Sequence, residues 1–164
     1  AQFLDLPAGA RVLDVGTGPG LALRLLSARQ PFVVGTDLSP AMLRHAATLF
    51  DPGMAAPLVA ADALALPFAG AAFDGALATN LLFLLPDPLA GLIEMARVTR
   101  LGGTVGWLNP SDRLSQSAAA AFCDGRGMTG FPRFSFINYA RIAEGHHRLS
   151  GEGWADLARA AGLP

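Results

Sequence analysis

The segment RVLDVGTGPG, residues 11–20, constrains the fold more than any other part of the chain. A short apolar run, typical of a buried strand, leads into a turn in which every second residue is glycine. Leu21, Leu25 and Ala28 then recur at helical spacing. The segment therefore predicts a strand, a tight turn and a helix, with a backbone that a ligand can approach closely because the glycines carry no side chains.

The same alternation continues along the next ninety residues. Helices are expected at 41–50, where Ser39 and Pro40 are typical of a helix start, and at 87–99, which Gly102 and Gly103 are expected to stop. The apolar run at 81–85 has the length of a buried strand. The remaining short apolar runs predict strands at 32–36, 57–62, 73–79 and 104–108. Strands separated by helical segments predict a doubly wound α/β fold, with a mainly parallel sheet in a three-layer α/β/α arrangement.

The last third of the chain departs from this alternation. Helices are expected at 111–123 and 154–161, with a loop at 125–130. We expect one domain over residues 1–164, in which residues 10–109 form a ligand-binding core and residues 110–164 form a covering segment, itself truncated.

Composition excludes several other classes of protein. The 164 residues are 52% hydrophobic, yet no run approaches the roughly 20 apolar residues of a membrane-spanning helix. The net charge of −1 argues against a general nucleic-acid binder. The single cysteine, Cys123, cannot form an internal disulfide, which favours a cytoplasmic location. No His, Cys and carboxylate cluster has the spacing of a metal site.

Polar residues stand where four predicted strands end: Asp14, Asp37, Asp62 and Asn80. In an open parallel sheet these ends share one edge, where ligands bind near the point at which the strand order reverses. The pattern predicts a crevice for a nucleoside-like ligand. A dinucleotide fingerprint needs a third small residue at position 21, where this chain has Leu21, so the spacing argues against a dinucleotide site. A P-loop needs a lysine, and the chain has none, so a P-loop is excluded.

Three segments carry a family resemblance: VLDVGTGPG at 12–20, VVGTDLSPAMLRHA at 33–46, and the long stretch at 61–105 that begins ADALALPF. They resemble class I S-adenosylmethionine-dependent methyltransferases, and more narrowly the branch that includes ubiquinone and menaquinone C-methyltransferases. The resemblance implies a Rossmann-like fold and methyl transfer from S-adenosyl-L-methionine, with S-adenosyl-L-homocysteine as product, to a small, partly apolar acceptor.

The resemblance also implies a cofactor-binding set. Its members are Asp14, Gly16, Thr17, Gly18 and Gly20 around the methionine portion, Asp37 at the ribose, Leu38 and Met42 on the adenine, Asp62 and Ala63 at the adenine amino group, and Asn80 and Leu81 near the methyl group.

The chain also departs from the family pattern. Phe83 and Leu84 stand where relatives often carry two histidines, so no catalytic residue is assigned. Candidate bases in the covering segment are Tyr139, Glu144, His146 and His147, each more typical of a structural or surface residue. The strand pair that closes the family's sheet is expected to be missing.

Three functions stay open on the sequence alone. The leading one is methyl transfer. The alternatives are a non-catalytic relative that binds a nucleoside cofactor or serves as a partner subunit, and, less favoured, a nicotinamide oxidoreductase. The expected partner is a small-molecule substrate, and a homodimer is compatible with the sequence.

Overall fold

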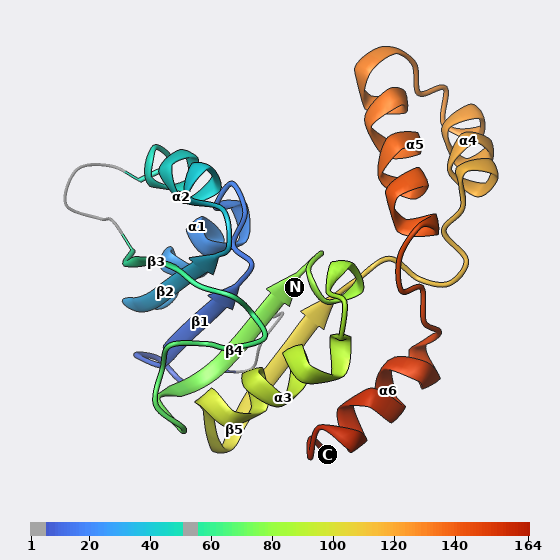
Figure 1. The fold of residues 1–164 in the computed structure, drawn as a ribbon. Coiled ribbons are helices and arrows are strands. Elements are labelled where there is room, and N and C mark those ends of the chain that lie inside the picture. The colour runs from blue at the N-terminus through green and yellow to red at the C-terminus, as the bar shows by residue number, and fades with distance from the viewer. Residues whose placement is uncertain (1–5, 51–55) are drawn as a thin grey trace.

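The computed structural model describes residues 6–50 and 56–164. Its centre is a five-stranded sheet with the order β3-β2-β1-β4-β5, in which every strand pair is parallel (Figure 1). The strands are β1 (Arg11–Val15), β2 (Phe32–Asp37), β3 (Leu58–Ala60), β4 (Phe73–Thr79) and β5 (Thr99–Leu108). The order reverses between β1 and β4, which confirms the predicted doubly wound α/β fold.

Helices cover both faces of this sheet. Leu13 and Val15 of β1 pack into a cluster that includes α3 (Pro88–Val98) and α6 (Gly151–Ala160). Val12, on the other face of the same strand, packs in a second cluster with α1 (Leu21–Ser27), and α2 (Pro40–Ala47) contacts β2 and β3. Successive residues of β1 are buried on opposite faces, as expected for a central strand of a parallel sheet.

The helices begin at the polar residues that the sequence provides. The side chain of Ser39 accepts a hydrogen bond from the backbone N–H of Met42 at the start of α2, as predicted. Asp87 caps α3 in the same way through Ala90. These caps satisfy backbone N–H groups that have no partner within the helix, and they set where each helix begins.

The last third folds as a helical hairpin and a returning helix. The hairpin consists of α4 (Gln116–Gly125) and α5 (Gly130–Glu144), and it extends away from the sheet (Figure 1). Small residues, including Ala119 and Ala140, are buried where the two helices meet, and so is Cys123. The chain then returns to the sheet through α6, whose Trp154 is buried in the same cluster as β1 and α3.

Several predicted elements need correction. Gly102 and Gly103 do not stop α3, which ends at Val98; they lie inside β5, which begins at Thr99 rather than at position 104. The register of β5 against β4 shifts beside these glycines, and a Cβ on Gly103 would stand only 2.6 Å from the carbonyl oxygen of Asp74. A close approach of two backbones therefore explains the glycine.

Other helices and strands differ from the sequence prediction because of local interactions. The apolar run at 81–85 contains a 3-10 helix, η1 (Leu82–Leu84), instead of a strand. α4 begins at Gln116, not 111, because Ser115 caps it, and α6 begins at Gly151, not 154, because Ser150 caps it. The fifteen-residue helix α5 was not predicted, because its aromatic residues are not spaced as one apolar face.

Candidate cofactor-binding site

The glycine-rich turn connects β1 to α1 at the carboxyl edge of the sheet. Gly16, Gly18 and Gly20 all adopt positive φ angles, of 67°, 52° and 90°. A Cβ on Gly16 would collide with the side chain of Leu81 at 2.7 Å, and one on Gly20 with Ala46 at 2.8 Å. A Cβ on Gly18 would meet nothing within 4 Å. Packing therefore requires Gly20, whose Cβ would meet the Cβ and the backbone of Ala46. At Gly16 the end of the Leu81 side chain would have to move, and Gly18 borders open space.

Asp14 is fully buried beneath this turn. The hydroxyl of Thr17 donates a hydrogen bond of 2.6 Å to its Oδ2, whereas its Oδ1 is buried without any partner among the described residues. The pKa of this carboxyl is raised from 3.8 to about 6, chiefly by burial. The hydrogen bond from Thr17 opposes the increase, and the nearby charge of Asp37 adds to it. The site therefore holds a buried acceptor that a positively charged or N–H-bearing ligand group would stabilise.

Asp37 stands at the end of the adjacent strand and ties the turn to the sheet. Its Oδ2 accepts the backbone N–H of Gly18, and its Oδ1 accepts that of Ser39, each at 2.8 Å. The backbone N–H of Thr17 donates to the carbonyl of Thr36 at 2.7 Å. A carboxylate has about four lone pairs, so Asp37 can hold the turn and still accept hydrogen bonds from a ligand.

Two large apolar side chains are exposed next to Asp37. Leu38 is 73% exposed and Met42, in the first turn of α2, is 44% exposed. Asp62, two residues beyond β3, is exposed and accepts the backbone N–H of Leu64 at 2.9 Å, and Ala63 beside it packs against the core. The exposed Leu38 and Met42 offer an apolar surface of the kind that a flat aromatic base packs against.

Asn80 and Leu81 follow β4 at the same edge. Leu81 contacts the position of Gly16, which brings the end of β4 against the glycine-rich turn. Asn80 has a positive φ of 55°, and its backbone N–H donates to the carbonyl of Leu108 at 2.7 Å. Its side-chain Oδ1 accepts a hydrogen bond of 2.6 Å from the hydroxyl of Tyr139, which lies on α5.

The strand register explains why these residues share one edge. Val15 of β1 lies beside Thr36 of β2 and Ala78 of β4, so the residues that follow each strand emerge together. Direct contacts connect the turn to Asp14, Asp37 and Leu81. The Asp62 and Ala63 pair emerges beyond β3, two strands away from β1.

The four candidate bases fall into different environments. Glu144 accepts two hydrogen bonds from Gln116, which lower its pKa and fasten α5 to the start of α4. His146 places its ring 6.1 Å from that of Phe83, and the backbone N–H of His147 donates to the carbonyl of Phe83. Only Tyr139 bonds directly to a predicted cofactor-binding residue. Sequence spacing gives no signal for that contact, because 59 residues separate Tyr139 from Asn80.

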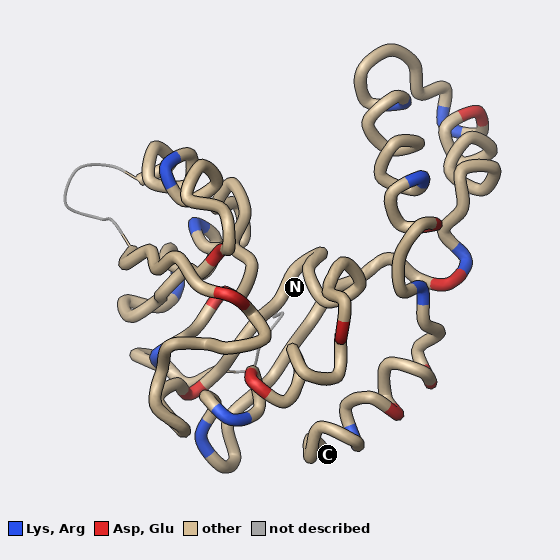
Figure 2. Tube along the Cα trace, viewed as in Figure 1, with Lys and Arg blue, Asp and Glu red and all other residues tan. Residues whose placement is uncertain are grey.

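Charge is distributed without a dominant sign. Acidic and basic residues are scattered over the sheet, the hairpin and α6 (Figure 2), in keeping with the net charge of −1. In the part of the chain that the structure describes, no helix is both long enough and apolar enough to cross a bilayer.

The parallel sheet, with its glycine-rich turn at the point of strand reversal, defines a Rossmann-like α/β domain. Comparison with known families matches the methyltransferase domain to residues 12–103, more than half of the chain. The chain therefore belongs to the methyltransferase domain family.

Individual relatives agree with this family. A demethylmenaquinone methyltransferase of Corynebacterium urealyticum is 42% identical over 100 residues, which cover 61% of this chain and 41% of that protein. A 2-methyl-6-phytyl-1,4-hydroquinone methyltransferase of Synechocystis is 34% identical over 112 residues, 66% of this chain and 35% of that protein. The chain thus matches between 35% and 41% of the length of these curated relatives.

A solved structure, that of the [4+2]-cyclase SpnF, superposes on 98% of this chain and 54% of its own with a TM-score of 0.72 and 25% identity. That neighbour is named for a cyclisation, so the fold by itself does not specify methyl transfer.

Proposed function

We propose that this chain binds S-adenosyl-L-methionine at the carboxyl edge of β1, β2 and β4 and transfers its methyl group to a small, partly apolar acceptor. The observation that carries the proposal is the turn at residues 16–20, where Gly18 borders open space. Thr17 of this turn bonds to Asp14, whose second oxygen is buried without a partner among residues 6–50 and 56–164. Membership of the methyltransferase domain family supports the same reading.

The residues present fit this cofactor. The buried Asp14 carboxylate suits a ligand that carries positive charge, the free lone pairs of Asp37 suit ribose hydroxyls, and the exposed Leu38 and Met42 suit an adenine ring. When bound, the cofactor supplies a methyl group already activated by a sulfonium, whose sulfur keeps the electron pair of the broken bond. The protein's part is then to hold the nucleophile in line and to exclude water.

The acceptor side of the site is apolar. Leu81, the fully buried Phe83, and Leu84, which is 41% exposed, follow β4 where a substrate would meet the methyl group. α5 and the segment after it lie against this region through Tyr139 and His146. We therefore assign residues 10–109 to cofactor binding and residues 110–164 to covering the acceptor side.

Two competing functions make different predictions for ligand binding. A nicotinamide oxidoreductase would bind NADH, but Leu21 stands at the third small position of the dinucleotide fingerprint and is 63% exposed. A non-catalytic relative would bind the cofactor without turning it over. Calorimetric titration with S-adenosyl-L-methionine, S-adenosyl-L-homocysteine and NADH distinguishes a methyltransferase from an oxidoreductase, because only the oxidoreductase should bind NADH. Release of S-adenosyl-L-homocysteine in the presence of a panel of acceptors distinguishes a methyltransferase from a non-catalytic relative.

A matched pair of glycine variants tests the location of the site. In Gly18→Ala and Gly127→Ala the new Cβ meets no atom within 4 Å, and both glycines have similar φ angles of 52° and 61°. Each variant should lose about 1–2 kcal/mol of stability from left-handed strain. Only Gly18→Ala should weaken binding of S-adenosyl-L-homocysteine, by about tenfold or more, because Gly127 lies in the hairpin loop. Equal affinities for the two variants would refute the proposed location.

A further inference from the structure

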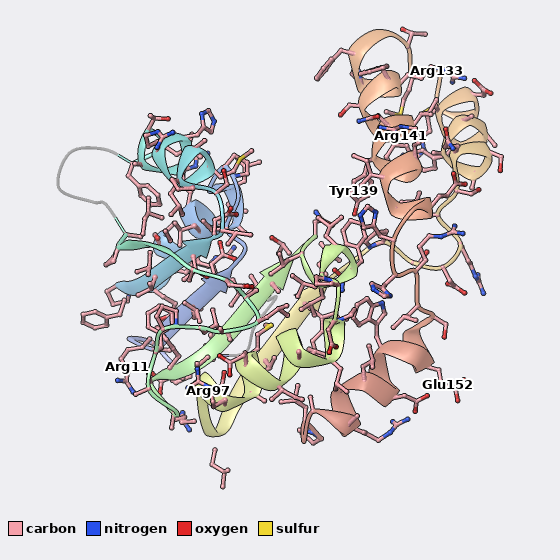
Figure 3. The ribbon with its side chains drawn as sticks, viewed as in Figure 1. Arg11, Arg97, Arg133, Tyr139, Arg141 and Glu152 are labelled. Carbon is pink, nitrogen blue, oxygen red and sulfur yellow. The ribbon has the colours of Figure 1, made fainter. Side chains whose placement is uncertain are left out.

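Tyr139 connects the helical hairpin to the edge of the sheet. The residue lies in the second half of α5 (Figure 3). Its hydroxyl donates a hydrogen bond of 2.6 Å to Oδ1 of Asn80. Burial raises the pKa of the Tyr139 hydroxyl, so this group stays protonated as a donor at neutral pH. The contact therefore fixes which end of the Asn80 amide faces α5.

The surroundings of Tyr139 hold its ring in place. The ring of Phe83 lies 6.3 Å from it in an edge-to-face arrangement, and the ring of His146 packs on Phe83 in a similar way at 6.1 Å. The backbone N–H of His147 donates to the carbonyl of Phe83 at 3.1 Å. Both the helix that carries Tyr139 and the segment after it are thus fastened to η1, directly after Asn80 and Leu81.

Asn80 is fixed at both its backbone and its side chain. Its backbone takes a positive φ of 55°, unusual for a residue other than glycine, and its N–H is bonded to β5 at Leu108. Oδ1 is occupied by Tyr139, whereas within residues 6–50 and 56–164 the two Nδ2 protons make no hydrogen bond. The exposed Asn80 therefore presents an oriented pair of N–H donors at the carboxyl edge of the sheet.

The consecutive residues Asn80 and Leu81 contact different parts of the molecule. Leu81 contacts Gly16 of the glycine-rich turn, whereas Asn80 contacts α5. Asn80 is itself exposed, and so is Leu84 four residues further along the chain, at 41%. A ligand oxygen that accepts from the Asn80 amide gains a hydrogen bond that a ligand without this oxygen cannot form.

We propose that Tyr139 is a positioning residue: it turns the amide donors of Asn80 toward the acceptor, so that the site selects acceptors with a hydrogen-bond-accepting oxygen next to the nucleophilic atom, such as phenols, hydroquinones and enols. This inference rests on the proposed function and narrows its substrate class. In the reaction the acceptor atom forms a bond to the methyl carbon as the bond from that carbon to sulfur breaks, and the proton of the acceptor atom passes to water. The Asn80 donors hold the neighbouring oxygen in place and favour its deprotonated form, which makes the adjacent atom nucleophilic before the methyl group is transferred.

Binding of two small probes tests this selection without requiring turnover. 1-Naphthol carries a hydroxyl oxygen next to a nucleophilic ring carbon, and 1-methylnaphthalene has nearly the same shape without that oxygen. Both are titrated into the wild-type chain, Tyr139→Phe, Asn80→Asp and the double variant, with and without saturating S-adenosyl-L-homocysteine. Asn138→Ala, which removes a hydrogen bond to Arg141 on the same helix, is the control.

We expect the wild-type chain to prefer 1-naphthol. Tyr139→Phe and Asn80→Asp should each weaken 1-naphthol binding about five- to tenfold and leave 1-methylnaphthalene binding unchanged, and the double variant should be no weaker than Asn80→Asp alone. Asn138→Ala should match the wild-type chain with both probes.

Other results would overturn the inference. Equal losses for both probes would show that Tyr139 has a purely structural role, and additive losses in the double variant would show that it does not act through Asn80. A wild-type chain that does not prefer 1-naphthol would exclude this substrate class. Failure of S-adenosyl-L-homocysteine to bind would instead refute the proposed cofactor, and the titrations without it would still measure the preference.

Discussion

Replacing Asp14 by asparagine should make the chain more stable at neutral pH, although it removes a residue of the proposed site. The side chain is fully buried, and burial raises its pKa from 3.8 to about 6 in the folded protein. The folded state therefore binds a proton more tightly than the unfolded chain does, and the stability that this proton contributes is lost as the pH rises through about 6. Asparagine has the same shape and keeps an acceptor for Thr17, but it carries no charge.

The size of the effect follows from the two pKa values. At pH 8, ionisation of the buried carboxyl lowers the free energy of unfolding by about 3 kcal/mol relative to a side chain that stays neutral. At pH 4 the same effect is about 0.5 kcal/mol. The stability advantage of Asp14→Asn over the wild-type chain should therefore grow by about 2.5 kcal/mol between pH 4 and pH 8. An unpaired amide N–H at the former Oδ1 position would shift the advantage by a constant amount at every pH.

Urea unfolding followed by tryptophan fluorescence measures this difference, because Trp154 is buried and Trp107 packs against it. Asp112→Asn, at an exposed aspartate, shows the effect of losing one surface charge. An advantage of Asp14→Asn that stays the same from pH 4 to pH 8, or that grows toward low pH, would refute the reasoning.

Three further predictions concern the same edge of the sheet. Affinity for S-adenosyl-L-methionine should fall about tenfold between pH 7.5 and pH 5 in calorimetric titrations, because protonation of Asp14 removes the charge that favours a cationic ligand, and Asp14→Asn should abolish this dependence. Gly20→Ala should lose more stability in urea unfolding than Gly18→Ala, since its Cβ would stand 2.8 Å from the Cβ of Ala46; equal losses would contradict the packing argument. Asp37→Ala should reduce cofactor affinity and also lower stability by about 2 kcal/mol, because two backbone N–H groups lose their acceptor. Reduced affinity with unchanged stability would show that Asp37 does not hold the turn.

The last of these predictions departs from what the sequence suggested about Asp37. Its position after an apolar strand indicated a ligand-binding carboxylate and gave no sign of a role in the fold. The structure adds a second role, since the backbone N–H of Gly18 donates to the same carboxylate. A variant at this position therefore needs a stability measurement beside the binding measurement.

The sequence by itself determined the architecture and the edge at which the candidate site lies. Apolar runs of strand length, separated by helical segments, allow only a parallel sheet covered on both faces, and parallel strands place their carboxyl ends together. The glycines at 16, 18 and 20 and the polar residues that follow each strand could therefore be assigned to one crevice. Local caps such as Ser39 were also predicted, because they depend on neighbouring residues alone.

Only the tertiary structure decided what depends on distant partners. The start of β5 follows from the close approach of Gly103 to β4, which no local pattern encodes. The raised pKa of Asp14 follows from burial, and burial is a property of the packed molecule. The contact between Tyr139 and Asn80 joins residues 59 positions apart, and it exists because the chain brings the end of α5 back to β4 after building a separate hairpin. Local preferences specify the elements, whereas contacts between elements specify which side chains meet.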